Sequence, residues 1–172
     1  GVARLFDIST GDEIFKLSPK DVPQVALFGQ SVAITKETAV VYANADGDGR
    51  NGAIYVYGRD NGHLLHVYTP ESLDISTIRP PLAAVEGSCA FRVLAPEEKD
   101  RFSVVVMNLE TGKISQRFDR PGGGQALKFG TDLAIDDGKL VVGDPGLGRP
   151  PVAWVFDVND GDVLKKLRPE KN

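Results

Sequence analysis

The stretch GVARLFDISTGDEIFKL, residues 1–17, is the first of four segments built alike: an apolar run, a short polar turn ending in Gly, and a second amphipathic run. The other three are GAIYVYGRDNGHLLHVY from Gly52, FSVVVMNLETGKISQRF from Phe102 and PVAWVFDVNDGDVLKKL from Pro151. The turn glycines, Gly11, Gly62, Gly112 and Gly161, are 51, 50 and 49 residues apart. Spacing this regular indicates an internal repeat of the length found in propellers and solenoids.

A second unit lies upstream of three of these segments. It reads LFGQSVAITKETAVVYA from Leu27 and KFGTDLAIDDGKLVVGD from Lys128, and Phe28 and Phe129 are 101 residues apart. Between them, RPPLAAVEGSCAFRVLA from Arg79 fits as a degenerate copy without the Phe-Gly pair. We therefore expect one segment over 1–172, with repeats at 27–70, 79–120 and 128–169 and half a repeat at 1–19.

Each full repeat predicts four short strands. In the repeat 27–70 they are expected near Ser31–Ile34, Ala39–Ala43, Ala53–Tyr57 and Leu64–Tyr68, in runs rich in Val, Ile, Tyr and Phe bounded by Gly, Asn and Asp. The third strands, AIYVY and VAWVF for example, are apolar on both faces, which predicts an interior position. The fourth strands alternate, and lysines as in VLKKL suit an outer edge.

Four antiparallel strands per unit, with no stretch of helical periodicity, predict an all-β fold of the β-propeller type rather than a solenoid. The chain holds about three and a half blades, whereas closed propellers have roughly four to eight. Residues beyond both termini, another chain or an open wedge would each accommodate the incomplete ring.

The segments FGQSVAI and FGTDLAI, with the AVVYANADGDGRNGAIYVYG and KLVVGDPGLGRPPVAWVFD that follow them, resemble FG-GAP repeats. These repeats form the blades of the integrin α-subunit head and of many bacterial surface proteins. The resemblance covers nearly the whole chain, although the GAP position is only partly kept, as Tyr-Ala-Asn at 42–44 and Gly-Asp-Pro at 143–145. The turn from Asp7 to Gly11 also resembles quinoprotein-type propellers, whose blades usually each carry a Trp, but this chain has only Trp154.

The resemblance implies a non-catalytic module that binds a protein or a glycan and is exported to the periplasm or the cell exterior. The incomplete ring adds open blade faces, which suit self-association. Two alternatives stay open. One is a part of a propeller enzyme, a quinoprotein-like dehydrogenase or a hydrolase, whose catalytic residues lie outside this chain. The other is a structural subunit of an oligomer.

Composition excludes several function classes. The net charge is −4, from 20 basic and 24 acidic residues, which argues against a nucleic-acid binder. No apolar run approaches the roughly 20 residues that span a bilayer. The single Cys89 excludes an internal disulfide and a multi-Cys metal site. Because the chain starts at Gly1 without a signal-like stretch, we expect a processed form or part of a longer product.

A calcium site is one reading of Asn44, Asp46 and Asp48 in the stretch NADGDGRNG, because oxygen ligands at alternating positions suit Ca²⁺. Integrin-type FG-GAP repeats carry related loops, but between the first two strands rather than the second and third. Tyr55 stands where an EF-hand places its bidentate Glu, and a plain hairpin loop explains the same residues. The corresponding loops PEEKDR and DPGLGRPP lack the cluster, so at most one site is expected.

No catalytic constellation is predicted. His63 and His66, three apart on a strand, point to opposite faces and do not favour a shared metal. Cys89 is expected to be a buried structural residue, and Asp136-Asp137-Gly138 a tight turn. PGGGQALKFG from Pro121 reads as a link between repeats, not a phosphate loop, because a strand follows it. The aromatic side chains expected to pack between blades are Tyr42, Tyr55, Tyr57, Trp154 and Phe156.

Overall fold

A computed structural model describes residues 1–19, 27–44, 52–94, 101–124, 126–146 and 148–170. The described residues form fourteen strands in four antiparallel sheets, which confirms the predicted all-β propeller segment. The strands are β1 (Ala3–Phe6), β2 (Glu13–Leu17), β3 (Ser31–Ile34), β4 (Thr38–Asn44), β5 (Gly52–Gly58), β6 (Leu64–Tyr68), β7 (Arg79–Val85), β8 (Ser88–Leu94), β9 (Phe102–Asn108), β10 (Ile114–Phe118), β11 (Leu133–Asp136), β12 (Lys139–Asp144), β13 (Val152–Asp157) and β14 (Val163–Leu167).

Three sheets are complete blades and one is half a blade. Blade 2 runs in the order β3-β4-β5-β6, blade 3 in the order β7-β8-β9-β10 and blade 4 in the order β11-β12-β13-β14. Blade 1 contains only β1 and β2, which correspond to the third and fourth strands of the other blades. As expected, the fourth strands β6, β10 and β14 lie at sheet edges.

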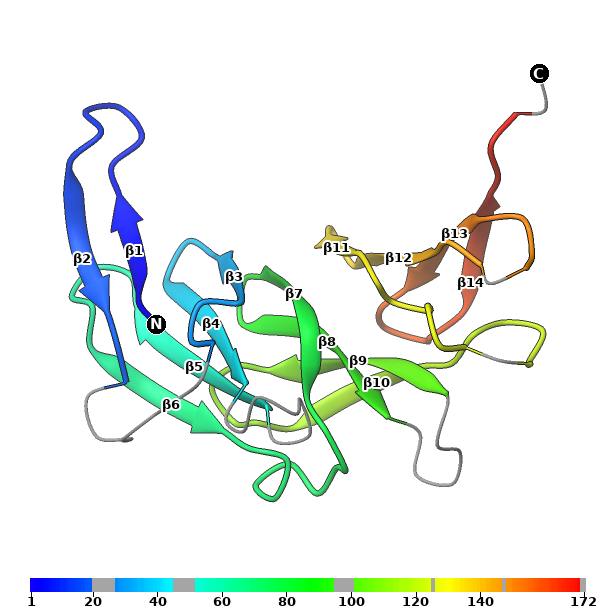
Figure 1. Ribbon diagram of the computed structural model, residues 1–172, viewed down its shortest axis with the longest axis horizontal. Helices are drawn as coiled ribbons and strands as arrows, with labels where there is room; N and C mark the ends of the chain where they lie inside the picture. Colours follow the sequence, from blue (N-terminus) through cyan, green and yellow to red (C-terminus); the bar gives the residue numbers. More distant parts are fainter. Residues whose placement is uncertain (20–26, 45–51, 95–100, 125, 147, 171–172) are drawn as a thin grey trace.

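The blades follow one another along an open arc (Figure 1), with the two termini at its opposite ends. The first strands of neighbouring complete blades contact each other, β3 with β7 and β7 with β11. The ring does not close within this chain. Among the described residues no helix is long and apolar enough to cross a membrane.

The core consists of three apolar layers, one at each junction between blades. Successive side chains of a strand point to opposite faces of its sheet, so each central strand contributes to two layers. In β4, Val41 belongs to the layer between blades 1 and 2, whereas its neighbour Tyr42 belongs to the layer between blades 2 and 3. The third layer, between blades 3 and 4, contains Trp154 and Phe156. The five aromatic residues predicted to pack between blades all lie in these layers.

The Phe of the Phe-Gly pair packs on its own blade, on the face that meets the preceding blade. Phe28 lies edge-on to Tyr55, with ring centroids 5.3 Å apart. Phe129 lies in the same way against Phe156, at 6.4 Å. In the degenerate repeat, the fully buried Ile78 belongs to the corresponding layer, which explains how blade 3 forms without the pair.

The turn glycines fit the blades together. All four have positive φ, between 65° and 82°, which L-residues adopt only at a cost. A Cβ on Gly62 would lie 2.9 Å from the Phe15 ring of blade 1, and one on Gly112 would lie 2.5 Å from the Tyr68 ring of blade 2. A Cβ on Gly11 would meet nothing described within 4 Å. In blades 2 and 3, the turn that contains this glycine therefore packs against the outer strand of the preceding blade.

We predict that Gly112→Ala destabilises the fold more than Gly11→Ala does. Both variants incur the left-handed backbone cost of about 1–2 kcal/mol. Gly112→Ala also forces Tyr68 away, which adds about 1–3 kcal/mol by analogy with an overpacked core. Urea unfolding of the two variants measures the difference, and equal loss of unfolding free energy would show that the Gly112–Tyr68 contact does not hold blades 2 and 3 together.

Candidate functional site

The end of the blade series at blade 4 is an unfilled apolar face. The sixth residue after each turn glycine points toward the next blade, and these residues are Leu17, Tyr68, Phe118 and Leu167. The first three are 4%, 8% and 1% exposed, because the next blade covers them. Leu167 is 40% exposed. We call its surroundings the terminal face of blade 4: Val141, Ala153, Val155 and Leu167, together with Lys165, all of which the strand register places on one side of the sheet.

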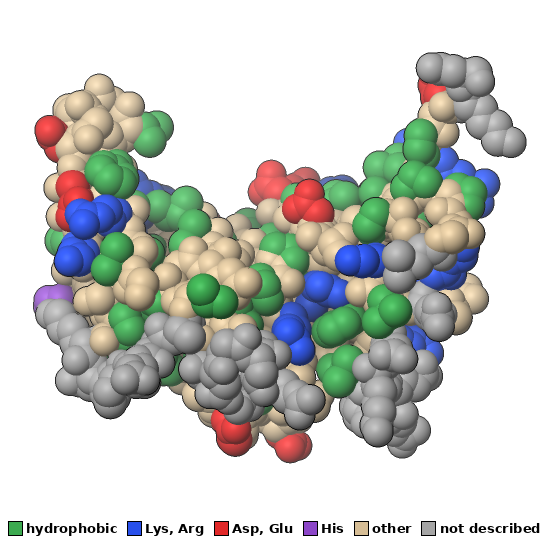
Figure 2. Space-filling view, in the orientation of Figure 1, with side chains coloured by type: hydrophobic (Ala, Val, Ile, Leu, Met, Phe, Trp, Pro, Cys, Tyr) green, Lys and Arg blue, Asp and Glu red, His purple; other side chains and the backbone are tan. Residues whose placement is uncertain are grey.

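The other end is the half blade. Its outward side chains include Val2, Phe6 and Ile14, all exposed, together with Arg4, which forms an ion pair with Glu13. Figure 2 shows the hollow between the two ends of the arc, with apolar and charged side chains interspersed along its margin.

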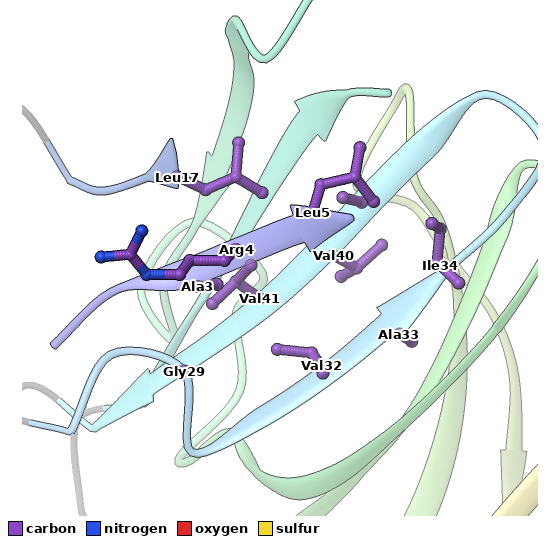
Figure 3. A pocket seen from close by; sticks show the side chains of 11 residues that line it. Ala3, Arg4, Leu5, Leu17, Gly29, Val32, Ala33, Ile34, Val40 and Val41 are labelled. Atoms are coloured by element: carbon purple, nitrogen blue, oxygen red, sulfur yellow. The ribbon is translucent and has the colours of Figure 1, made fainter. Parts of the chain in front are cut away.

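A groove lies between β1 and β3, on the side of β1 that β2 does not occupy. It is a cavity of about 320 Å³. Figure 3 shows Leu5 and Leu17 of blade 1 on one side and Val32, Ile34 and Val41 of blade 2 on the other. Of the described residues that line it, only Arg4 carries a charge.

Polar side chains occupy the end of the second strand in two blades. Asn44 ends β4 and Asp144 ends β12, at equivalent positions in the repeat, and both are buried. Asn44 Oδ1 has no hydrogen-bond partner among the described residues. Asp144 accepts a hydrogen bond from Arg120 Nε at 2.6 Å. The other two residues of the predicted calcium cluster, Asp46 and Asp48, lie outside the described residues.

The pair of Arg120 and Asp144 is a polar junction that the sequence analysis did not single out. Arg120 also donates to the Gly123 carbonyl at 2.8 Å, so its guanidinium fixes the link between blades 3 and 4 onto the end of β12. Asp144 belongs to the GAP position of its repeat, as Asn44 does in the repeat 27–70. This equivalence to Asn44 is the sequence signal that could have pointed to Asp144.

A second arginine, Arg92, also binds the segment that links blades 3 and 4. Arg92, on β8, donates to the Leu127 carbonyl at 2.9 Å and lies 4.0 Å over the Phe102 ring. Its Cα neighbour across the sheet is Arg79. Burial, reinforced by the charge of Arg79, lowers the pKa of Arg92 to about 10, so it remains cationic at neutral pH.

The histidines are not brought together. His63 is exposed, whereas His66 is half-buried and stacks on Tyr68 with ring centroids 5.7 Å apart. Cys89 is fully buried, and burial raises the pKa of its thiol to about 12. A thiol in that state is protonated and shielded at neutral pH, which fits the structural role predicted for it.

Two turn predictions also hold. Asp137 and Gly138 form a two-residue connection between β11 and β12, with φ of 45° and 67°, the signs a tight hairpin requires. The glycines of PGGGQALKFG lie between β10 and β11, and no helix follows among the described residues. Groups of three or more His, Cys, Asp or Glu suited to a metal are absent from the described part of the chain.

Comparison with known families gives a match over residues 12–57, to the FG-GAP repeat. The chain carries an FG-GAP repeat. The matched stretch covers β2, the Phe-Gly pair, β3, β4 and most of β5, which agrees with the resemblance noted on the same residues. No curated protein matches the chain in sequence.

Solved structures similar to this chain are propellers. The β-propeller domain of the Trilobed protease from Pyrococcus furiosus, described as having an open velcro topology, shares 16% identity at a TM-score of 0.61, over 86% of this chain and 44% of that one. A europium-containing methanol dehydrogenase shares 14% at 0.51, over 86% and 27%. Glutaminyl cyclase from Myxococcus xanthus shares 10% at 0.50, over 85% and 53%. The chain spans less than half the length of the first two, and identities this low show the fold alone.

We predict that Arg120→Met destabilises the protein far more than Arg4→Met. Removing Arg120 leaves the Asp144 carboxylate, 2% exposed, buried without its cation, which costs about 3–5 kcal/mol. The pair of Arg4 and Glu13 is exposed, so its loss costs about 1 kcal/mol at most. Denaturant midpoints test this, and a small effect of Arg120→Met would mean that Asp144 finds another partner or reaches water.

Proposed function

We propose that the chain is a non-catalytic FG-GAP-type propeller module that binds a protein partner and acts as a scaffold. The observation that carries the proposal is the exposure of Leu167, which is 40% exposed where its three counterparts are almost fully covered by the next blade. An apolar position that the next blade covers elsewhere in the repeat, and that is exposed here, is a surface on which a protein partner can pack.

The character of the open ends favours a protein over a glycan. The terminal face of blade 4 has four aliphatic side chains beside Lys165, and the outward side of blade 1 presents Val2, Phe6 and Ile14 beside the ion pair of Arg4 and Glu13. Burying aliphatic surface against a partner lowers the free energy, because that surface leaves water. A glycan would instead require polar groups that form hydrogen bonds with its hydroxyls. Self-association through these ends is the simplest form of such binding, because each copy carries both ends.

We also propose that Asn44, Asp46 and Asp48 hold one Ca²⁺. The support is Asn44 Oδ1, a buried oxygen without a hydrogen-bond partner among the described residues. Buried polar atoms are rarely left unpaired, and a hard cation is one partner that satisfies a carbonyl oxygen. With a calcium-stiffened loop and a surface built for partners, we propose that the module works outside the cytoplasm, in the periplasm or the cell exterior.

Light scattering on a sizing column tests the binding proposal. We expect the native chain to associate as its concentration rises, and Leu167→Lys to shift the chain toward the mass of a monomer, since a charge in an apolar interface must be desolvated. The matched control is Leu65→Lys, which is 48% exposed on β6 and lies beside blade 3 rather than at either end, so this variant should associate like the native chain. A native chain that stays monomeric at every concentration would contradict self-association.

Titration calorimetry with Ca²⁺ tests the metal proposal. We expect the native chain to bind one ion, and the double variant Asp46→Ala with Asp48→Ala to lose the binding because two anionic ligands are removed. Asp136→Ala with Asp137→Ala, two exposed aspartates in a hairpin turn, is the control for general charge effects. Absence of a binding heat in the native chain, at two temperatures, would remove the site.

A further inference from the structure

We propose that the free edge of β6, together with the crevice beside it, binds an extended segment of a partner protein that is both apolar and basic. The inference rests on the proposed binding function and names the chemistry of the partner. The site belongs to blade 2, a complete four-stranded blade with a neighbour on each side, so it does not depend on the open ends of the arc. Figure 1 shows β6 on the convex side of the arc.

The sequence of β6 is the first line of support. Every outer strand has a free edge, and charged side chains, lysine above all, protect such edges from pairing with another chain. The other three outer strands carry this protection, as Lys16 in β2, Arg117 in β10, and Lys165 and Lys166 in β14. β6 has the sequence LLHVY, without Lys, Arg, Asp or Glu. Its edge is therefore open to strand addition in a way that the edges of its counterparts are not.

The exposed side chains of β6 are the second line of support. Leu64, Leu65 and Val67 are each at least 40% exposed. The corresponding residues of β10 include the polar Ser115 and Arg117. β6 pairs only with β5 among the described residues, so its other edge presents backbone N–H and C=O groups. An added strand would bond to these groups and cover the aliphatic side chains beside them.

A crevice between blades 2 and 3 opens beside this edge. It is a cavity of about 240 Å³, and Leu65 and His66 of β6 form part of its lining. Val56 and Leu109 add apolar surface from the two blades. The crevice therefore continues from the exposed strand into the junction between two complete blades.

The charged residues that line the crevice are acidic. They come from three turns: Glu37 between β3 and β4, Glu86 between β7 and β8, and Glu110 between β9 and β10. Within the described part of the chain, none of the three forms an ion pair. The charge of Glu110 adds to burial in raising the pKa of the Tyr68 hydroxyl, so the negative potential reaches β6 itself. Carboxylates gathered at a cleft attract a cation from a partner.

The edge and the crevice together define the occupant. The register with β5 places Leu64 and Val67 on the face toward blade 1, and His66 on the face toward blade 3. Successive side chains of an added strand would face these two sides in turn. Apolar side chains on one side would cover Leu64 and Val67. A Lys or Arg on the other side would pack its alkyl stem in the crevice and keep its charge among the carboxylates.

A second copy of the chain is not the expected occupant. It would have to offer one of its own outer strands, and its β6 carries no basic side chain. In β14, Lys166 already lies 4.5 Å over the Trp154 ring of its own blade. The occupant is therefore an extended segment of a different protein, and pairing between copies is an outcome that the test must distinguish.

The test is peptide binding to the full chain, followed by fluorescence anisotropy. The probe is the capped peptide TVKVKVT, which alternates Val and Lys. TVEVEVT keeps the pattern and reverses the charge, whereas TVKPKVT keeps the charge and disrupts the strand, because Pro has no N–H. We expect TVKVKVT to bind about tenfold or more tightly than either control peptide. It should also slow hydrogen exchange of the β6 amides that do not bond to β5, by roughly fivefold or more.

Variants of the edge test strand addition. Leu65→Lys gives β6 the kind of charge that the other outer strands carry, and should weaken binding of TVKVKVT by about tenfold or more. Ser115→Lys makes the same change at the corresponding position of β10, where Ser115 is exposed, and should bind the peptide like the native chain.

Variants of the crevice test its choice of charge. Glu86→Gln with Glu110→Gln should remove the preference for TVKVKVT over TVEVEVT, because two carboxylates of the lining are lost. Asp136→Asn with Asp137→Asn makes the same charge change at two exposed residues of the β11–β12 turn, outside the crevice, and should keep the preference.

Equal binding of the three peptides, or no binding of TVKVKVT to a chain that circular dichroism shows to be folded, would overturn the proposal. Slow β6 exchange that appears without peptide as the concentration rises, and is lost in Leu65→Lys, would also overturn it, because a second copy would then hold the edge. Leu167→Lys should reduce association and leave peptide binding unchanged, whereas Leu65→Lys should do the reverse, so this inference and the proposed function fail separately.

Discussion

A blade of this protein has two apolar faces, and only neighbouring blades can cover both. The two central strands of blades 2 and 3 place adjacent residues in different layers, as Val41 and Tyr42 show. No blade can therefore bury its own core, unlike a helix hairpin or a sandwich. The stability of each blade depends on the blade before it and the blade after it, so any chain that contains less than a full ring has two places where this requirement is unmet.

The effect of a neighbouring blade on burial can be measured within this chain, because the same position of the repeat is covered in some blades and exposed in another. One repeat position gives Leu17, Tyr68 and Phe118 in covered settings and Leu167 in an open one. Another gives the covered Leu82 and the open Val32. Full burial of a side chain of this size is worth about 1.5–3 kcal/mol, and several such residues lie at each end. Leu17 and Leu167 are the same residue type at the same position of the repeat, so the difference in their exposure comes from the next blade, which covers Leu17 and not Leu167.

Much of this architecture was predictable from the sequence, for a physical reason. The spacing of Gly11, Gly62, Gly112 and Gly161 reports a turn that requires positive φ in every blade, and the apolar runs around it report buried strands. Polar junctions were not predictable, because whether Arg120 meets Asp144 or water depends on how the link between blades folds. The groove was not predictable either, because Val32 has the apolar character of a buried strand residue and yet is 58% exposed in the structure. Of the proposed calcium ligands, only Asn44 lies among the described residues.

The two ends differ in the kind of selectivity they can have. Apolar packing is not directional, and within the chain the angle between blades is fixed by directional bonds. Tyr68 donates to the Leu109 carbonyl of blade 3 at 2.9 Å, and the Leu82 N–H donates to Ser31 Oγ of blade 2 at 2.9 Å. The terminal face of blade 4 consists of side chains, whose packing is not directional. The edge of β1 that β2 does not occupy carries backbone N–H and C=O groups, whose hydrogen bonds are directional, so the two ends differ in the kind of contact they can make.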